Sequence, residues 1–518
     1  MDNIRILWTD DEIDLLKPHI LFLENKGYTV DTASNGDDAI ELVKSNSFDL
    51  IFLDENMPGK SGLEILREIK SIFPSIPIVM ITKSEAEDIM EAAIGSQIAD
   101  YLIKPVNPNQ ILLTIKKNID HQRLVTKKNT ADYQAEFGKI GMDISYANSW
   151  QDWIDIYKKV TYWELEMDKS NENAMDEVLK MQKTEANNSF FRYISKNYFN
   201  WFEGEGEDTP LLSPNVFRKK VFPSLNRGEK TFVIVIDNLR FDQWKVIQPL
   251  IRDFFYMEEE DLFCSILPTA TQYARNAMFA GLMPAEIHKM YPDLWVDEDA
   301  EGSKNSNEEA LLEKQLKRFN INKKFHYDKI KHNWEGKKIV DNLTNIIHND
   351  LTVLVYNFVD MLSHARTELQ MIRELASDES AYRSLTLSWF RHSPLLDLLK
   401  KLSDQNVKVI ITTDHGMVKV HNPIKVVGDR NTTTNLRYKQ GKSLNYKPKE
   451  VFEVTDPAKA HLPKTNISSS YIFATGEDFF AYPNNFNHYV KYYRDTFQHG
   501  GISMEEMLIP VITLKSKK

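Results

Sequence analysis

The sequence has one cysteine, no long apolar run and no excess of basic charge, and each of these absences excludes a class of protein. With only Cys264 among 518 residues, no internal disulfide can form, and its apolar surroundings suit a core position. No apolar stretch is long enough to cross a bilayer. The formal net charge of −11 argues against general coating of nucleic acid, although a local basic groove remains compatible with it. The charged residues Asp2 and Arg5 argue against a signal peptide at the start of the sequence. We therefore expect a cytoplasmic protein.

Proline is absent between residues 125 and 205, and glycine is rare there. Apolar and aromatic residues recur at three- and four-residue spacing, for example at Trp150, Trp153 and Tyr157, which predicts a helical bundle. On both sides of this region short apolar runs alternate with helical patterns, as in βα units.

These changes of pattern divide the chain into three expected domains. They are an α/β domain at residues 1–122, a helical bundle at 123–205 and a second α/β domain at 206–518. A long polar region, from about Pro423 to Pro463, interrupts the pattern of the last domain and is expected to form a cap.

In the first domain four expected strands each end in polar side chains. These end residues are the acidic pair Asp10 and Asp11, then Asp54, Thr82 and Lys104. The carboxyl ends of parallel strands meet at one edge of a sheet, so these groups should lie together. Three carboxylates there suit a hard cation such as Mg²⁺, a lysine adds positive charge, and a hydroxyl can follow a phosphoryl group.

This arrangement resembles the receiver domain of two-component response regulators, a doubly wound domain with a parallel five-stranded sheet. The resemblance implies that Asp54 accepts a phosphoryl group from a sensor histidine kinase and that phosphorylation favours a homodimer. It implies a Mg²⁺ site made of Asp10, Asp11, Asp54 and Asn56. It also implies switch residues at Thr82, Tyr101 and Lys104.

The last domain carries a second set of candidate ligands at its expected strand ends. They are Asp237, Asp360, His364, Asp414, His415 and His499. Six oxygen and nitrogen ligands suit two borderline cations and leave room for water or substrate. Two such cations can clamp the attacking and leaving oxygens of an in-line displacement at phosphorus. Thr271 begins an expected helix between these ligands, where N–H groups and the helix dipole favour a phosphoryl group.

Four segments resemble the alkaline phosphatase superfamily: Thr271–Gly281, Asp360–His364, Asp414–Met417 and His499–Gly501. The first two most resemble its nucleotide pyrophosphatase/phosphodiesterase branch. The resemblance implies Thr271 as the nucleophile; if it does not serve, Thr269 is the next candidate. It implies two zinc ions, the choice of zinc over manganese resting on the family. One ion would be held by Asp360, His364 and His499. The other would be held by Asp237, Thr271, Asp414 and His415.

Candidate substrate contacts are less specific. Arg275 or Asn276 could hold a non-bridging phosphate oxygen, and His421 could touch the substrate. Basic residues of the expected cap, Arg437 among them, could hold a second phosphate or a base-bearing strand. Alternatively, Arg275 and the basic cap residues are simply solvated and have no role in substrate binding.

A receiver joined to such a domain resembles the PorX-like response regulators, which carry a PglZ domain and regulate type IX secretion. We therefore expect a zinc-dependent phosphodiesterase output that acts on nucleotide or oligonucleotide diesters. No helix-turn-helix follows the receiver, so direct operator binding is not expected. The alternative is a non-catalytic metal-containing module whose output is contact with a sigma factor or a secretion component.

Overall fold

The computed structural model describes most of the chain, and its contacts divide it into two compact units. The described residues are 4–73, 76–83, 98–168, 175–204, 206, 208–298, 300, 302–368, 378–429, 432–464, 466 and 468–517, without the side chains of 120–131 and 364–368. One unit contains Met1–Gln134, and the other contains Ala135–Asp168 and Asn173–Lys518. The helical region after residue 135 therefore shares a unit with the last domain.

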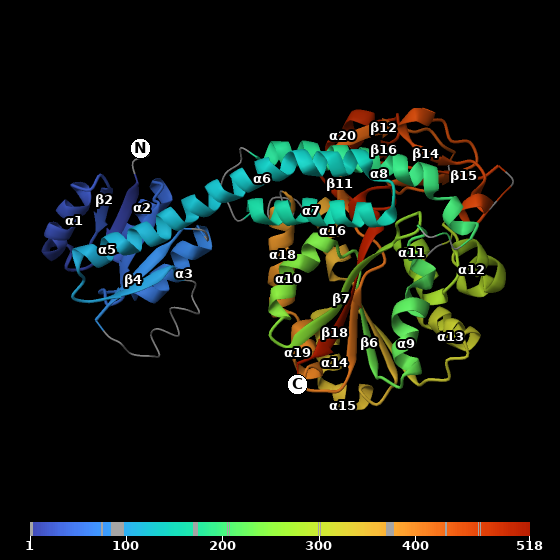
Figure 1. The fold of residues 1–518 in the computed structure, drawn as a ribbon, viewed down its shortest axis with the longest axis horizontal. Helices are drawn as coiled ribbons and strands as arrows, with labels where there is room; N and C mark the ends of the chain where they lie inside the picture. The colour runs from blue at the N-terminus through green and yellow to red at the C-terminus, as the bar shows by residue number, and fades with distance from the viewer. Residues whose placement is uncertain are drawn as a thin grey trace. The chain divides into compact units, whose positions relative to one another are not determined.

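The first unit is built on a parallel five-stranded sheet of order β2-β1-β3-β4-β5 (Figure 1). Its strands are β1 (Arg5–Thr9), β2 (Thr29–Ala33), β3 (Leu50–Asp54), β4 (Ile78–Thr82) and β5 (Asp100–Ile103). The strands β3 and β4 are buried along their whole length, as expected of near-continuous apolar runs covered on both faces. The expected doubly wound receiver-like sheet is confirmed.

Helices cover this sheet, and three of them begin after a side-chain cap, from Asn35, Ser61 and Asn107. They are η1 (Ile13–Leu16), α1 (Lys17–Glu24), α2 (Gly36–Ser45), α3 (Gly62–Ile72), α5 (Pro108–Ile115) and the π-helical turn η2 (Lys116–Asp120). Ser61 and Glu64 form a capping box at the start of α3, which fixes the loop after Asp54. Gly62, the first residue of α3, lies so near the strand that a Cβ would be 2.4 Å from the Asp54 carbonyl oxygen.

Three long helices follow, as the 125–205 pattern predicts. They are α6 (His121–Tyr146), α7 (Trp150–Asp168) and α8 (Asp176–Asn197). The periodic aromatic side chains of α7 are buried, and Trp153 packs on Phe190 of α8 with ring centroids 5.4 Å apart. Burial of this stripe stabilises the pair far more than helix propensity does.

The second unit contains a six-stranded mixed sheet of order β7-β18-β10-β6-β9-β8. Its strands are β6 (Thr231–Ile236), β7 (Phe255–Cys264), β8 (Phe325–Ile330), β9 (Leu351–Tyr356), β10 (Lys408–Thr412) and β18 (Leu508–Ser516). The four strands from β10 to β8 are parallel, whereas β18 is antiparallel to both β10 and β7. The carboxyl ends of β6, β7, β9 and β10 consequently lie at one edge.

Helices cover both faces of this sheet, with α9, α11 and α13 on one side and α10, α18 and α19 on the other (Figure 1). The longer helices are α10 (Phe241–Ile247), α11 (Thr271–Ala280), α12 (Pro284–Met290), α13 (Glu308–Arg318), α14 (Asn333–Asp341), α16 (Phe358–Glu368), α18 (Glu379–His392) and α19 (Pro394–Leu402). The short ones are η3 (Asn200–Phe202), η4 (Ser213–Asn215), η5 (Phe217–Val221), α9 (Phe222–Asn226), η6 (Gln248–Leu250), η7 (Pro292–Leu294), α15 (Leu343–Ile346) and α21 (Met504–Met507).

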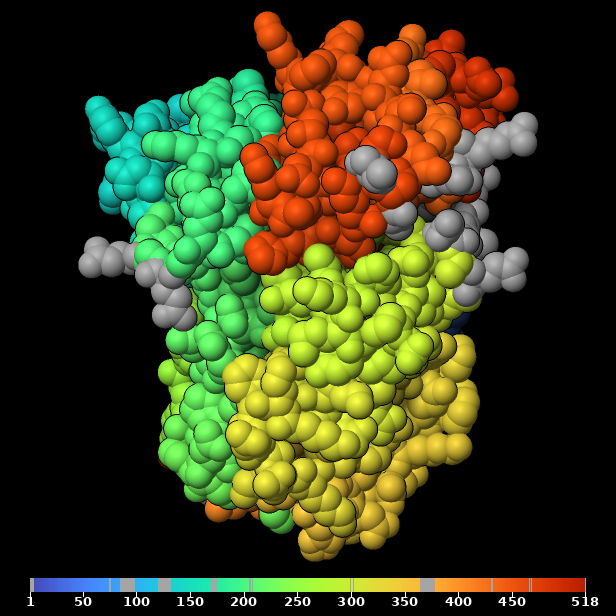
Figure 2. Space-filling model, turned by 90° about the vertical axis from the view of Figure 1, so that its right-hand side faces the viewer, coloured from blue at the N-terminus to red at the C-terminus, as the bar shows by residue number. Residues whose placement is uncertain are grey.

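The expected cap is present, and it is longer than the sequence indicates. Between β10 and β18 the chain forms small sheets of its own, β11-β17, β12-β16 and β13-β15-β14. Its elements are β11 (Val418–Lys419), β12 (Asn422–Lys425), β13 (Tyr438–Gly441), η8 (Pro448–Glu450), β14 (Phe452–Val454), η9 (Pro457–Ala460), β15 (Ser470–Phe473), β16 (Asp478–Ala481), α20 (Phe486–Tyr493) and β17 (Phe497–Gln498). In the space-filling view this orange region sits directly on the yellow-green residues beneath it (Figure 2). Tyr273 of α11 meets Tyr438 and Tyr471 of the cap there.

Among the described residues, no helix is both long and apolar enough to cross a membrane.

Candidate functional site

Three carboxylates meet at the carboxyl edge of the receiver sheet. Ligand atoms of Asp10, Asp11 and Asp54 lie within 4.8 Å of one another. Asp10 and Asp54 are almost fully buried, whereas Asp11 is exposed. The buried Oδ2 of Asp54 accepts no hydrogen bond from the described residues. An acidic cluster with an unpartnered buried oxygen fits a site that a hard cation or a phosphoryl group would complete.

Lys104 supplies the positive charge at this cluster. Its Nζ lies 2.9 Å from Oδ2 of Asp10 and 3.0 Å from Oδ1 of Asp54. Burial raises the pKa of Asp54, and Lys104 opposes that rise while Asp10 and Asp11 add to it. The lysine thus favours the charged form that an acceptor needs.

The remaining predicted receiver residues lie on β4, on β5 and in the loop after β3. Thr82 is buried at the end of β4, and its carbonyl accepts the backbone N–H of Lys104 at 2.8 Å. Tyr101 on β5 is 37% exposed. Asn56 follows Asp54 in the loop before α3 with an exposed side chain. These placements agree with the residues' expected roles, which stay predictions.

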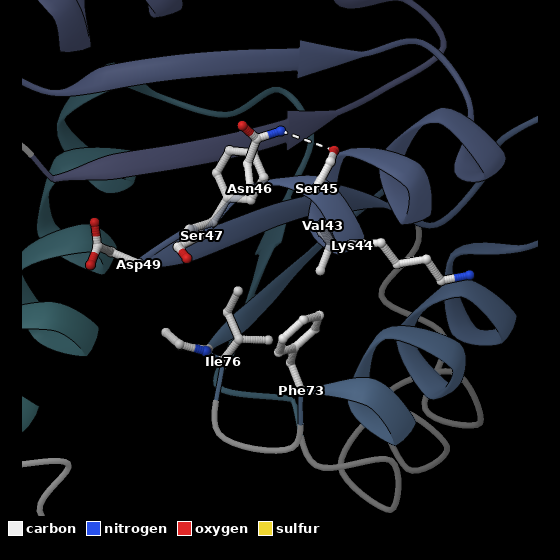
Figure 3. Close-up of a pocket in the computed structure, with 10 residues that line it drawn as sticks. Val43, Lys44, Ser45, Asn46, Ser47, Asp49, Phe73 and Ile76 are labelled. Atoms are coloured by element: carbon white, nitrogen blue, oxygen red, sulfur yellow. Dashed lines mark hydrogen bonds between the residues drawn. The ribbon is translucent and has the colours of Figure 1, made fainter.

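A separate hollow of about 380 Å³ lies at the opposite, amino-terminal end of β3 and β4. Figure 3 shows Val43 and Lys44 of α2 on one side of it and Phe73 and Ile76 on the other. Its lining contains none of the predicted receiver residues. The acidic cluster, and not this hollow, is the candidate site of the first unit.

In the second unit the predicted ligands follow strands that end at one edge of the sheet. Hydrogen bonds tie these strand ends together. The backbone N–H of Leu239, after β6, donates to Oγ1 of Thr413, after β10, at 3.2 Å. The hydroxyl of Ser265, after β7, donates to the carbonyl of Asp414 at 2.7 Å. Gly416 lets the chain pass close to Glu505, since a Cβ there would be 2.0 Å from the Glu505 carbonyl oxygen.

Asp237, Asp414 and His415 form a buried cluster with ligand atoms within 4.8 Å of one another. Burial raises the pKa of Asp237 to about 7, and Arg275 opposes the rise. Burial also raises the pKa of Asp414. Oδ1 of Asp237 is buried without a hydrogen-bond partner among the described residues. Two buried carboxylates, a histidine and an unpartnered oxygen fit a borderline divalent cation, whose charge would keep both acids ionised.

The second predicted ligand set lies beside this cluster. The rings of His415 and His499 stack with centroids 4.3 Å apart. Nε2 of His499 is 4.0 Å from Oδ1 of Asp360, which stands in the first turn of α16. Nδ1 of His499 lies 3.2 Å from the carbonyl of Thr269, so a proton on Nδ1 would leave Nε2 as the ligand atom. His364 is in α16, but its side chain lies outside the described residues.

Thr271 is the first residue of α11, as predicted, and Ala270 before it has extended backbone geometry. Its Oγ1 lies 3.1 Å from Nε2 of His415, close enough for the hydroxyl to donate a hydrogen bond. Nδ1 of His415 lies 3.1 Å from the carbonyl of Gly416, and a proton held there would leave Nε2 as an acceptor. Thr269, the other candidate nucleophile, is fully buried and donates its hydroxyl to Gly501 at 2.8 Å.

Arg275 is not the substrate contact or the solvated residue that the sequence suggests. Its guanidinium is fully buried, with Nη1 2.9 Å from Oδ2 of Asp237 and Nε 2.7 Å from Oε1 of Glu308. Asn276 is also buried, and its Nδ2 donates to the carbonyl of Lys304 at 3.1 Å. Both side chains are held by protein partners because the turns of α11 that follow Thr271 face the core.

Arg437 is neither the substrate contact nor the solvated cap residue that the sequence suggests. The side chain is fully buried, and its Nη2 lies 2.6 Å from Oε2 of Glu506. For His421 the sequence suggested a contact with the substrate. It pairs with Asp495 at 2.6 Å and lines a cavity of about 510 Å³ whose lining includes none of the predicted metal ligands. Arg437 therefore belongs to the packing of the cap, whereas His421 is partly exposed at this cavity.

Sequence reasoning missed Glu308 and Asn357. The Nδ2 of Asn357 donates to Oδ2 of Asp237 at 3.0 Å, and Asn357 directly follows β9. Its place after an apolar strand is the same signal that identified the ligands. Glu308 begins α13, far along the chain from Arg275, and no local pattern marks it.

Comparisons with known proteins cover all three regions. Residues 6–116 match the response regulator receiver domain, and residues 123–202 match the PorX response regulator linker domain. Residues 216–514 match the BREX system PglZ alkaline phosphatase-like domain.

Individual relatives match the receiver part. The transcriptional regulatory protein ZraR of Klebsiella oxytoca is 36% identical over 140 residues, which are 27% of this chain and 32% of that protein. The alginate biosynthesis transcriptional regulatory protein AlgB of Pseudomonas syringae pv. tomato is 33% identical over 27% of this chain and 31% of its own length. The chain thus spans about a third of the length of these curated relatives.

A solved CheY-like receiver domain from Methanospirillum hungatei JF-1 is 27% identical, with a TM-score of 0.23, and the match covers 24% of this chain and 98% of that one. The PglZ match alone covers more than half of the 518 residues. With the receiver and linker matches before it, the chain belongs to the PorX-like response regulators, in which a receiver and a linker precede a PglZ alkaline phosphatase-like domain.

Proposed function

We propose that this response regulator has a phosphodiesterase output that uses Thr271 as nucleophile and two zinc ions as cofactors. Its substrates would be nucleotide or oligonucleotide diesters. A sensor histidine kinase would phosphorylate Asp54, with Mg²⁺ in the receiver cluster. Phosphorylation would favour a homodimer, and the setting would be the cytoplasm and the control of type IX secretion. The domain boundaries near residues 122 and 205 are part of this proposal.

One observation carries the proposal most strongly. The hydroxyl of Thr271 lies 3.1 Å from His415, at the start of α11, within the group of buried carboxylates and imidazoles. N–H groups at a helix start can bind phosphate oxygens, and a cation held by the neighbouring carboxylates and imidazole would lower the pKa of the hydroxyl. A structural threonine would not need such surroundings.

In the proposed reaction, Oγ1 of Thr271 attacks phosphorus as its hydroxyl proton passes to water. One ester oxygen then leaves with a proton, and the phosphoryl group stays on Oγ1 of Thr271 with its second ester group attached. Water then cleaves the bond between phosphorus and Oγ1, which restores the hydroxyl and releases a phosphomonoester. The free N–H groups at the start of α11 stabilise the charge that develops on the non-bridging oxygens.

Zinc, when bound, would supply the charge that polarises the phosphoryl oxygens and lowers the pKa of the Thr271 hydroxyl. One ion would take Asp237, Thr271, Asp414 and His415, and the other Asp360, His364 and His499. The two predicted substrate-binding arginines that the structure describes are already paired, Arg275 with Asp237 and Glu308 and Arg437 with Glu506. Neither is free for the extra charge of a monoester, which supports a diester substrate.

The test compares a chromogenic phosphodiester with the matching monoester, with and without a chelator. We expect faster hydrolysis of the diester, loss of activity with chelator and recovery with Zn²⁺. A protein that contains no transition metal and turns over neither ester would contradict the proposal and favour an output through protein contact with a sigma factor or secretion component.

A further inference from the structure

Arg275 is a fully buried positive charge between two carboxylates of the candidate metal centre and a third acid. Besides the contacts of Nη1 with Asp237 and Nε with Glu308, its Nε lies 3.8 Å from Oδ2 of Asp414. Removing a guanidinium from water is costly unless its partners are well placed. We therefore look for a role of Arg275 that an apolar side chain could not fill.

Glu308 is itself held in place. It is 1% exposed at the start of α13, the hydroxyl of Tyr327 donates to it, and Nζ of Lys329 lies 3.3 Å from it. These contacts fix the carboxylate that receives Nε of Arg275. The guanidinium is therefore held from the side of Glu308, and its Nη1 forms an ion pair with Asp237 without a hydrogen bond to a described residue.

The two oxygens of Asp237 have different surroundings. Oδ2 lies 2.9 Å from Nη1 of Arg275 and accepts a hydrogen bond from Nδ2 of Asn357 at 3.0 Å. Oδ1 is buried and has no hydrogen-bond partner among the described residues. Anchoring one oxygen fixes the carboxylate plane and presents the other oxygen to a cation.

We propose that Arg275 is a positioning residue, which with Asn357 anchors Oδ2 of Asp237 so that Oδ1 is presented to a divalent cation, while Glu308 fixes the guanidinium. The inference rests on the metal centre of the proposed function. It assigns the planar, forked shape of arginine a role that a point charge cannot fill, because lysine cannot bridge Asp237 and Glu308 in the same way.

If only the charge of Arg275 mattered, the effect on metal affinity would be the opposite. A positive group beside a cation site repels the cation, so Arg275→Met would bind metal more tightly and Arg275→Lys would match the wild type. If positioning dominates, both variants bind more weakly at one of the two sites. Changes to groups that orient a metal ligand typically cost roughly 10- to 100-fold in affinity.

The experiment is a titration of metal-stripped, full-length protein with Zn²⁺ against a chromogenic chelator. We expect the wild type to bind two ions, and Arg275→Lys and Arg275→Met to lose roughly 10- to 100-fold in affinity for one ion and to keep the other. Asn357→Ala, which removes the second anchor at a half-buried position, should weaken the same ion. Arg227→Lys is the matched control, because Arg227 forms an exposed pair with Glu229.

Circular dichroism checks that each variant is folded. If both Arg275 variants are unfolded, the zinc affinity of Asn357→Ala tests the inference in their place. The inference is overturned if the folded Arg275 variants, or Asn357→Ala in their place, bind both ions as the wild type does. Tighter binding by Arg275→Met, or a wild type that binds no zinc, also overturns it. A wild type that binds two ions but cleaves no diester would reject the proposed catalysis and leave this inference standing.

Discussion

At the scale of single residues, Thr271 and Thr269 show how the structure separates the proposed nucleophile from a packing hydroxyl. Thr269 donates to Gly501 and accepts from the backbone N–H of Gly500, so its hydroxyl holds the loop that follows His499. Thr271 is half-buried and meets an imidazole. The two threonines are two residues apart, yet their hydroxyl groups have different partners.

We predict that Thr271→Val abolishes diester hydrolysis, because valine has nearly the same shape but no hydroxyl. The expected loss is at least about a hundredfold in kcat, roughly 2.7 kcal/mol of transition-state stabilisation. Thr271→Ser keeps the hydroxyl and should retain measurable activity. Steady-state kinetics on a chromogenic diester checks both variants, and wild-type turnover by Thr271→Val would identify another nucleophile.

A second prediction concerns Lys439, a cap lysine that the sequence suggested was solvated or on a lid. It is 3% exposed, donates to the carbonyl of Thr433 at 2.8 Å, and burial lowers its pKa to about 8. Because the folded pKa lies below the unfolded value of 10.5, folding favours the neutral amine. The stability that this preference contributes is present above pH 10.5 and is lost as pH falls through 8.

The free energy of unfolding of the wild type, relative to Lys439→Met, should therefore rise between pH 8 and pH 10.5. The expected rise is on the order of 3 kcal/mol. Chemical denaturation at several pH values measures it, and Lys442→Met serves as the comparison at an exposed position of the same segment. A difference that stays constant over this range would mean that Lys439 is not desolvated.

At the scale of elements, helix α8 of the linker is bound to the segment that leads into β18. Nζ of Lys183 lies 2.8 Å from Glu164 of α7 and 3.0 Å from Glu505 of α21. Asn187 donates to Glu505 at 3.2 Å and accepts the backbone N–H of Met504 at 2.8 Å. These contacts explain why the linker helices share a compact unit with the PglZ domain.

We predict that Lys183→Met strongly destabilises this unit, because it leaves two buried carboxylates without their cation. Breaking such a pair typically costs roughly 3–5 kcal/mol. Adding Glu505→Gln should restore part of the loss, since it removes one of the unpaired charges. Lys180→Met, at an exposed position on the same helix, should change stability by less than about 0.5 kcal/mol. Urea denaturation measures all variants, and equal stability of Lys183→Met and Lys180→Met would contradict the expectation.

At the scale of the whole molecule, the receiver would act through its state of association. Beryllofluoride with Mg²⁺ mimics a phosphoryl group at Asp54, and the new anion would lie beside Lys104 and draw Thr82 towards it. Tyr101, now 37% exposed, could then turn inward and change the surface near β5. A ligand shifts such an equilibrium only by its differential affinity for the two states.

We therefore predict that beryllofluoride shifts the wild type from monomer to dimer in a concentration-dependent way. The shift should be absent in Asp54→Ala, which cannot bind the mimic. Analytical ultracentrifugation of both proteins, with and without the mimic, measures the effect. An unchanged wild-type mass at micromolar concentration would show that the receiver signals by another route.

Much of this molecule is decided by local properties of its sequence. The apolar runs and their polar ends specify the strands, because burial of a strand depends on its own side chains. The places of Asp10, Asp54, Asp237, Asp414 and Thr271 at the ends or starts of elements follow directly. The buried stripe of α7 follows from helical spacing in the same way.

Only the tertiary structure decided what surrounds those residues. Arg275 stands one turn after Thr271 and Arg437 in a basic segment, so both suggested substrate contacts, but each is buried against an acid from a distant part of the chain. Glu308 and Glu506 provide those partners, and no local pattern links them to their arginines. The energy of a buried charge depends on every neighbour within a few ångströms, and those neighbours are brought together only by folding.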